Sequence, residues 1–208
     1  MPAEAFLDSL ARAQRGDAPF AHWRLRDALP AEVVVHLAAL PFSPPAAPRF
    51  DGRREANNST RVYFSPATQA EHPVCAQVAA AFRDPAVIGA IQAQTGARLE
   101  GTRLRIEYCQ DVDGFWLEPH LDIPVKRLTL LIHLSDDPRL AHAGTDLYGP
   151  APDHAPAGRA EFGPGRGLIF IPGTDSWHGF SPRPIEGVRK SLIVNYVDAT
   201  WRAVEELA

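Results

Sequence analysis

The sequence predicts a mainly β domain of the α+β class, in which a jelly-roll or cupin-like double sheet is braced by N-terminal helices. From Arg98 onward, short apolar or alternating runs are separated by clusters of Gly, Pro and Asp, which is the pattern of strands and turns. The first 97 residues instead carry the apolar spacing of amphipathic helices. The 20 prolines favour many short elements over a helical bundle.

The length and composition of the chain predict a single domain over residues 1–208. With 45% hydrophobic and 22% charged residues, the chain has an ordinary globular composition and can bury one sizeable core. We expect a helix-rich part over residues 1–97 and a sheet core over residues 98–200.

The N-terminal part is expected to hold four helices and two short strands. Pro30 can occupy the first turn of a helix, where its missing N–H costs nothing, and Gly96 can end one. The segment Pro41–Pro48 contains four prolines and is expected to be a loop. The expected helices lie near Ala3–Ala13, Pro30–Leu40, Thr68–Phe82 and Pro85–Gln94, and the expected strands at His22–Arg26 and at the end of Asn57–Phe64.

The C-terminal half is expected to form eight short strands. So many short strands in about a hundred residues indicate a sandwich or barrel-like double sheet. The expected strands are Arg103–Cys109, Phe115–His120, Lys126–Leu134, Thr145–Tyr148, Arg159–Phe162, Gly167–Ile171, Trp177–Gly179 and Arg189–Val197.

Charge and cysteine content exclude several classes of function. The net charge of −4 gives no basic footprint, so nucleic-acid binding is disfavoured. The two cysteines, Cys75 and Cys109, form no CxxC pair, which argues against a disulfide framework or structural zinc. The N-terminus lacks the order of a signal peptide, and no apolar run approaches membrane-spanning length. We therefore expect a soluble cytoplasmic protein, of an oligomeric state that the sequence leaves open.

Three residues form a candidate metal site. His120 and Asp122 are two apart at the end of an expected strand, so both can point to one side. His178, which follows Trp177, can supply a third ligand. Two imidazoles and one carboxylate leave three positions open on a divalent iron. Taken singly, an HxD tripeptide arises readily by chance, and His178 could simply be hydrogen-bonded in a loop beneath Trp177.

The last expected strand carries a candidate anion site. Alternation places Arg189 and Ser191 on the same face. A guanidinium can hold a carboxylate through two hydrogen bonds, and the hydroxyl can add another. An isolated Arg189 would more often be an edge-strand residue in a surface ion pair.

The ordered series HxD, distal His and GxRxS resembles the Fe(II)/2-oxoglutarate-dependent oxygenase superfamily, and its pattern is closest to the prolyl-4-hydroxylase-like branch. The resemblance covers about Arg103–Val197. It implies a double-stranded β-helix in which the two histidines and the aspartate bind iron. The four residues implied for the 2-oxoglutarate pocket are Arg189 as anchor with Ser191, Tyr108 as a lining aromatic, and His133 at a position where relatives often have tyrosine.

The resemblance also implies a reaction. The expected activity is hydroxylation of a substrate C–H bond with Fe(II), 2-oxoglutarate and O₂, releasing succinate and CO₂, with ascorbate as a reductant. Because Asp122 is present, the halogenase variation is disfavoured. Two other functions stay open at this point: a cupin-type metal dioxygenase or isomerase that does not use 2-oxoglutarate, and a non-catalytic jelly-roll binding module.

The substrate is expected to be a small molecule or a peptide, which the sequence does not identify. Three residues are candidates for contact with it. Arg61 ends the polar run Asn57–Arg61, which is either a substrate-reading loop or a turn. Trp116 shares the expected strand face with His120, although a packed tryptophan is the simpler interpretation. Lys126 could attract an anionic group or be a solvated strand end. His142 and His154 lie in an expected loop.

Overall fold

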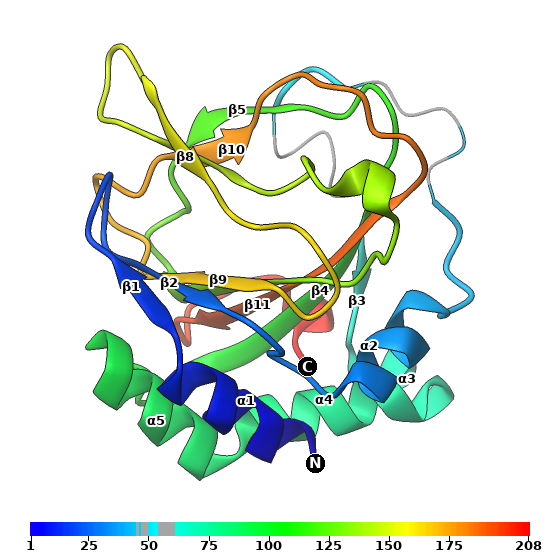
Figure 1. Ribbon diagram of the computed structural model, residues 1–208. Helices are drawn as coiled ribbons and strands as arrows, with labels where there is room; N and C mark the ends of the chain where they lie inside the picture. The colour runs from blue at the N-terminus through cyan, green and yellow to red at the C-terminus, as the bar shows by residue number, and fades with distance from the viewer. Residues whose placement is uncertain (45, 47–49, 54–60) are drawn as a thin grey trace.

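A computed structural model of the chain describes residues 1–44, 46, 50–53 and 61–208. Two antiparallel sheets face each other, and helices from the N-terminal half cover the outer side of the larger sheet (Figure 1). The predicted α+β arrangement, with helices bracing a double sheet, is therefore confirmed.

The larger sheet has seven strands and the smaller one has four. Every strand pair in both sheets is antiparallel. The larger sheet runs in the order β1 (Gln14–Gly16), β2 (His22–Leu25), β9 (Gly167–Phe170), β6 (Lys126–His133), β11 (Arg189–Val197), β4 (Arg103–Asp111) and β3 (Val62–Tyr63). The smaller sheet runs in the order β5 (Leu117–His120), β10 (His178–Phe180), β7 (Asp146–Tyr148) and β8 (Pro156–Arg159).

The helices form a layer against the larger sheet. Helix α4 places Val78, Ala79 and Phe82 in the core, and burying a side chain of the size of Val78 or Phe82 stabilises the fold by about 1.5–3 kcal/mol. Phe6 of α1 packs edge-on against Phe82 with ring centroids 5.0 Å apart. The helices are α1 (Pro2–Ala11), α2 (Ala31–Ala38), α3 (Pro66–Glu71), α4 (Pro73–Arg83) and α5 (Pro85–Thr95), with 3₁₀ turns η2 (Pro138–Leu140) and η3 (Val204–Glu206).

Strand β11 shows how alternation divides the larger sheet into two chemically different faces. Lys190 and Tyr196 point toward the helices, where the Tyr196 hydroxyl donates to the Phe82 carbonyl at 2.6 Å and the Lys190 ammonium donates to the Ala38 carbonyl at 2.6 Å. The residues that alternate with them, Arg189, Ser191, Ile193 and Asn195, point toward the smaller sheet. A second apolar cluster lies between the two sheets and contains Phe20, Leu131, Leu147, Ala160, Leu168 and Phe170.

Two expected elements differ from the structure, and one strand was not expected. The helix expected over Thr68–Phe82 is two helices, because the residue before Pro73, His72, has extended angles (φ −123°, ψ 98°). The strand expected at Arg159–Phe162 is β8, which ends at Arg159 because its partner β7 begins opposite that residue, at Asp146. Strand β1 was not expected at all, since three polar residues give no apolar alternation.

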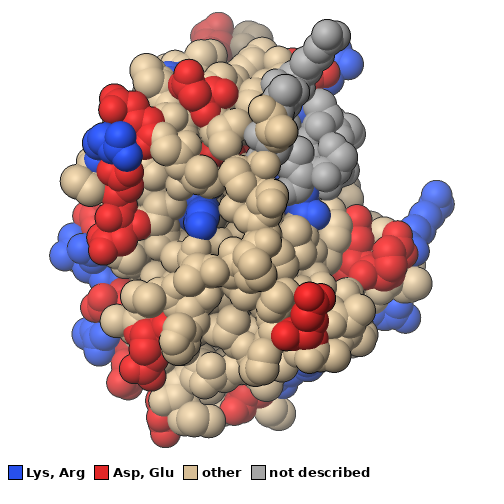
Figure 2. Space-filling model, turned by 90° about the vertical axis from the view of Figure 1, so that its right-hand side faces the viewer, with Lys and Arg blue, Asp and Glu red and all other residues tan. Residues whose placement is uncertain are grey.

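The outer surface mixes both signs of charge. On the face in Figure 2, acidic and basic side chains of the described residues are scattered around a broad uncharged area, without a continuous basic patch. Among the described residues, no single helix is long and apolar enough to cross a membrane; only α4 and α5 taken together, with a 55° bend between them, have the length and composition.

Candidate metal centre

His120, Asp122 and His178 converge at one edge of the smaller sheet. His120 ends β5 and His178 begins β10, and the two are directly opposite each other in the register of these strands. One ligand atom from each of the three residues lies within 4.8 Å of the other two. The short strands β5 and β10 therefore position two of the ligands, and the turn after β5 brings the carboxylate to the same point.

Backbone hydrogen bonds fix the orientation of both histidines. Nδ1 of His120 lies 2.9 Å from the Glu118 carbonyl, and Nδ1 of His178 lies 2.9 Å from the Ser176 carbonyl. Because a carbonyl can only accept, each Nδ1 carries the hydrogen, and the lone pair of each ring is then on Nε2. This is the tautomer in which an imidazole binds a metal through Nε2, and a two-histidine, one-carboxylate donor set suits Fe(II).

Asp122 is held by two residues of β6. Its carboxylate accepts hydrogen bonds from the Thr129 hydroxyl at 2.7 Å and from the Lys126 ammonium at 2.6 Å. The side chains of Asp122 and Lys126 are 1% and 2% exposed. Lys126, expected at a solvated strand end or on a substrate surface, is thus a buried partner of the metal-ligand carboxylate, although it also lines the outer cavity described below.

Arg189 lies on the facing sheet, where it begins β11. Its Nε donates to the Ala143 carbonyl at 2.7 Å, and its Nη1 donates to the Asp111 carboxylate at 2.5 Å. Asp111 is also its direct cross-strand neighbour on β4. The guanidinium lies 4.9 Å from the centroid of the Phe180 ring. Arg189 is therefore a buried residue in an ordered ion pair, in contrast to the surface edge-strand arginine considered above.

A cavity of about 50 Å³ lies between the metal-ligand histidines and Arg189. The Ser191 hydroxyl is buried beside Arg189 and has no hydrogen-bond partner among the described residues. A guanidinium and an unused hydroxyl at one end, with metal ligands at the other, are the donor set that a 2-oxo dicarboxylate requires. The cavity is lined by Arg61, Asp111, Phe115, Leu117, His120, Leu131, Thr145, His178, Gly179, Phe180, Arg189, Ser191 and Ile193.

Comparisons with solved structures find the same fold in several prolyl hydroxylases. A Pseudomonas putida prolyl-4-hydroxylase has 20% identity and a TM-score of 0.59, covering 96% of this chain and 93% of its own. A Trichoplax adhaerens prolyl hydroxylase, solved with a peptide fragment of the hypoxia inducible factor oxygen degradation domain, has 12% identity and a TM-score of 0.62, covering 94% and 89%. A prolyl 4-hydroxylase from Phytophthora capsici has 13% identity and a TM-score of 0.58, covering 95% of this chain and 64% of its own.

The chain has the prolyl-hydroxylase fold. This fold is a double-stranded β-helix, so the fold class predicted from the sequence is confirmed. The likeness lies in the structure, since no protein-family model and no curated protein sequence matches the chain.

Arg61 lines the same cavity as Arg189. Its side chain is 8% exposed and its Nη1 lies 3.7 Å from Asp111. Burial alone would lower the pKa of Arg61, but neighbouring Cys109, Asp111 and Glu107 outweigh it and raise that pKa. Arg61 was expected to contact substrate; the structure places it at the candidate co-substrate cavity. The rest of the run to which it belongs, residues 57–60, lies outside the described residues.

Asp111 is the charged cavity residue that was not predicted from the sequence. Beyond the exposed Arg103, the residues of β4 on this face of the sheet are Arg105, Glu107, Cys109 and Asp111, all of them polar or titratable and all buried. Such a row is unusual for a central strand, whose buried face is ordinarily apolar. This row of polar and titratable residues was visible in the sequence and could have indicated that Asp111 belongs to a functional site.

His133 is enclosed next to Ser191, its cross-strand neighbour. The imidazole is fully buried, its nitrogens have no hydrogen-bond partner among the described residues, and its ring lies 4.6 Å from that of Phe162. Burial, and secondarily the charge of Arg189, hold the pKa of His133 well below its ordinary value. His133 is therefore neutral at physiological pH and lies close to the candidate anion anchor.

Tyr108 does not reach the cavity. It points to the helix side of β4, where its hydroxyl donates to the Leu37 carbonyl of α2 at 3.0 Å and its ring packs 5.2 Å from Phe42. Because side chains alternate along a strand, Tyr108 and Asp111 cannot share a face. Its expected role as a lining aromatic is replaced by a packing role under α2.

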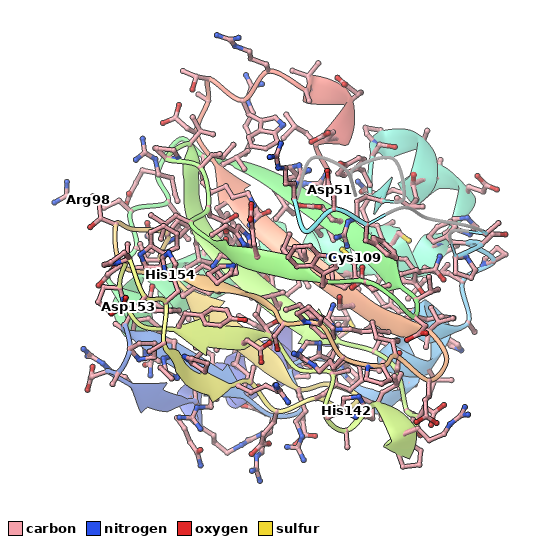
Figure 3. The ribbon with its side chains drawn as sticks, turned by 90° about the horizontal axis from the view of Figure 1, so that it is seen from above. Asp51, Arg98, Cys109, His142, Asp153 and His154 are labelled. Atoms are coloured by element: carbon pink, nitrogen blue, oxygen red, sulfur yellow. The ribbon has the colours of Figure 1, made fainter. Side chains whose placement is uncertain are left out.

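Trp116 also has a packing role. A Cβ added to Gly52 would lie 2.2 Å from the indole ring, so the tryptophan sits directly on the Gly52 backbone. His142 and His154 lie in different parts of the molecule in the view of Figure 3, and neither lines the cavities at the candidate metal site. Nε2 of His142 lies 2.8 Å from the Pro184 carbonyl, and His154 stacks on Trp177 with ring centroids 4.1 Å apart.

Two further cavities differ in their relation to the metal ligands. An outer cavity of about 190 Å³ contacts His120 and Asp122 from the solvent side, and its lining includes Arg53, Glu118 and Ile123, which is 52% exposed. A larger cavity of about 770 Å³ lies between α1 and α2 and includes none of the three metal-ligand residues. Of these two cavities, only the outer one contacts the candidate metal ligands.

Proposed function

We propose that this protein is an Fe(II)- and 2-oxoglutarate-dependent hydroxylase. The observation that carries the proposal is that three ligand atoms, from His120, Asp122 and His178, lie within 4.8 Å of one another while two of these residues share a cavity with the buried Arg189. A cupin-type metal enzyme needs the first feature only. A binding module needs neither feature.

Each side chain of the site has a proposed role that follows from its position. His120, Asp122 and His178 would hold the metal, which with 2-oxoglutarate and O₂ supplies the oxidant for hydroxylating a C–H bond, with release of succinate and CO₂. Arg189 and Ser191 would bind the far carboxylate of 2-oxoglutarate. Thr129 and Lys126 orient Asp122 through hydrogen bonds of 2.7 and 2.6 Å. Both hold the carboxylate in place for the metal.

The substrate would reach the metal through the outer cavity beside β5. This cavity of about 190 Å³ combines the charged Arg53 and Glu118 with the exposed Ile123. Such a mixed surface suits a peptide segment or a small polar molecule with one apolar group. The Trichoplax adhaerens prolyl hydroxylase, whose fold this chain shares, was solved with a peptide bound.

The proposal is tested by binding and turnover together. Purified protein should bind Fe(II), or Mn(II) as a stable substitute, and should form succinate from 2-oxoglutarate in the presence of O₂ and ascorbate, at least by slow uncoupled turnover. His178→Ala should lose both properties. His142→Ala, which removes a rim histidine bonded to the Pro184 carbonyl, should retain both. Absence of metal-dependent 2-oxoglutarate binding in the unchanged protein would reject the proposal.

A further inference from the structure

The candidate co-substrate cavity contains its own carboxylate. Asp111 lies between two arginines, 2.5 Å from Nη1 of Arg189 and 3.7 Å from Nη1 of Arg61. The side chains of the three residues are 3%, 6% and 8% exposed, in the order Asp111, Arg189 and Arg61. In this environment the ion pairs are poorly screened by solvent.

Three of the five N–H donors of the Arg189 guanidinium already have partners. Its Nε donates to the Ala143 carbonyl, its Nη1 to Asp111, and its Nη2 lies 3.5 Å from the Thr145 hydroxyl. The adjoining cavity of about 50 Å³ holds a few water molecules at most, which is less than a five-carbon dicarboxylate needs. A carboxylate arriving at Arg189 must therefore take the place of a contact that exists.

The charges around Arg61 and Arg189 are balanced before any ligand arrives. Glu107 also faces Arg61, but it is paired with Arg105, whose Nε donates to Glu206 at 2.6 Å. Three guanidinium groups thus meet three carboxylates across the described residues of this region. An added carboxylate would bring an excess of negative charge unless the contacts rearrange.

We propose that Asp111 is an internal competitor that sets the affinity for 2-oxoglutarate, and that Arg61 retains Asp111 when Arg189 turns to the incoming carboxylate. This inference rests on the proposed function, because it concerns the same site. Asp111 mimics the far carboxylate in the resting protein and keeps Arg189 ordered. Arg61, which already lies near the other oxygen of Asp111, lowers the cost of breaking the pair with Arg189.

The proposal predicts opposite effects at the two positions. Asp111→Asn removes the competing charge with little change of shape, so the Kd for 2-oxoglutarate should fall by at least about tenfold, which is the smallest effect usual for a charge within 4–6 Å. Arg61→Met leaves Asp111 dependent on Arg189 alone, so that Kd should rise by at least about fivefold. Asp198→Asn removes another arginine-paired aspartate, beyond the end of β11 and outside the cavity, and should leave the Kd unchanged.

The experiment is calorimetric titration of 2-oxoglutarate into the Mn(II)-loaded full chain without oxygen, supported by the thermal shift that 2-oxoglutarate induces. The double variant Asp111→Asn/Arg61→Met decides between two roles of Arg61. If Arg61 acts through Asp111, its replacement should have little effect once Asp111 is neutral. An equal weakening in both backgrounds would instead make Arg61 a direct anchor and overturn the exchange between the arginines.

The outcomes separate this inference from the proposed function. If the unchanged protein and every variant fail to bind 2-oxoglutarate with metal present, the proposed function is wrong. If the unchanged protein binds it and Asp111→Asn binds no more tightly, only the competitor role is overturned. Should Asp111→Asn fail to fold, as shown by circular dichroism, Asp111→Ser takes its place in the single and double variants, and an unchanged Kd in Arg61→Met overturns the inference by itself.

Discussion

Replacing Gly179 with alanine should disrupt the metal centre without touching any ligand. Gly179 follows His178 in β10, where the register with β5 is irregular between His178 and Phe180. An alanine Cβ at this position would lie 2.6 Å from the Leu117 carbonyl oxygen and 2.9 Å from the Glu118 carbonyl oxygen. Both obstacles are backbone atoms of β5, so no side chain can rotate out of the way.

The size of the effect follows from these two distances. An ordinary contact is 3.4 Å or longer, so β5 and β10 must separate by about 0.5–0.8 Å. Such overpacking typically destabilises a fold by about 1–3 kcal/mol. Because β5 carries His120 and β10 carries His178, the same movement exceeds the roughly 0.2 Å tolerance of metal–ligand distances. We expect metal affinity to fall at least about tenfold.

The assay is a titration of apo protein with Mn(II) or Co(II), together with thermal unfolding. Gly89→Ala is the matched control, because a Cβ there meets nothing within 4 Å and the residue lies inside α5. That control should bind metal normally and be more stable by about 0.5–1 kcal/mol. If Gly179→Ala binds metal within twofold of the unchanged protein, the close approach of β5 and β10 does not set the ligand geometry and the reasoning is refuted.

Three other predictions test separate parts of the site. Tyr108→Phe and Tyr196→Phe should each lower the free energy of unfolding by about 1 kcal/mol, because each loses a buried hydrogen bond to a helix carbonyl. A changed Kd for 2-oxoglutarate in Tyr108→Phe would contradict the packing role of Tyr108 and show that it contacts the cavity. Thr129→Val should weaken metal binding about tenfold in a Co(II) titration by freeing one oxygen of Asp122, and unchanged affinity would show that this bond does not orient the ligand. Below about pH 6.5, His133 takes up a proton in the unfolded chain but stays neutral in the folded one, so the free energy of unfolding should fall by up to about 1.4 kcal/mol for each unit by which the pH is lowered. In urea titrations at several pH values, His133→Leu should reduce this dependence on pH. An equal pH dependence in the variant and the unchanged protein would contradict the prediction. The charged group facing His133 is Arg189, which opposes its protonation.

The three candidate metal ligands could be singled out from the sequence because their spacing is a local feature of the chain. A strand end places His120 and Asp122 on one side whatever the rest of the fold does, and His178 follows a buried strand and a turn. The alternation predicted for β11 likewise placed Arg189 and Ser191 on one face, as the structure has them.

The side on which β4 faces the cavity was predicted wrongly. Tyr108 was assigned to the cavity from the family resemblance, whereas the pairing of β4 with β11 shows that Asp111 opposite Arg189 faces the cavity and that Tyr108 faces α2. A shift of one residue exchanges the two faces of a strand. The split between α3 and α4, by contrast, was available from Pro73, because proline restricts the residue before it.

The two ends of the candidate co-substrate cavity belong to different sheets, and this determines what can change independently. The metal-ligand histidines are on the smaller sheet and Arg189 is on the larger one. The distance between the two sheets therefore limits the length of a molecule that can bind between these residues. That distance is maintained by apolar side chains packed between the sheets, which include Phe20, Leu131, Leu147, Leu168 and Phe170. A bulkier or smaller residue in this apolar cluster would therefore alter the length of ligand that the cavity accepts, without any change to His120, His178 or Arg189.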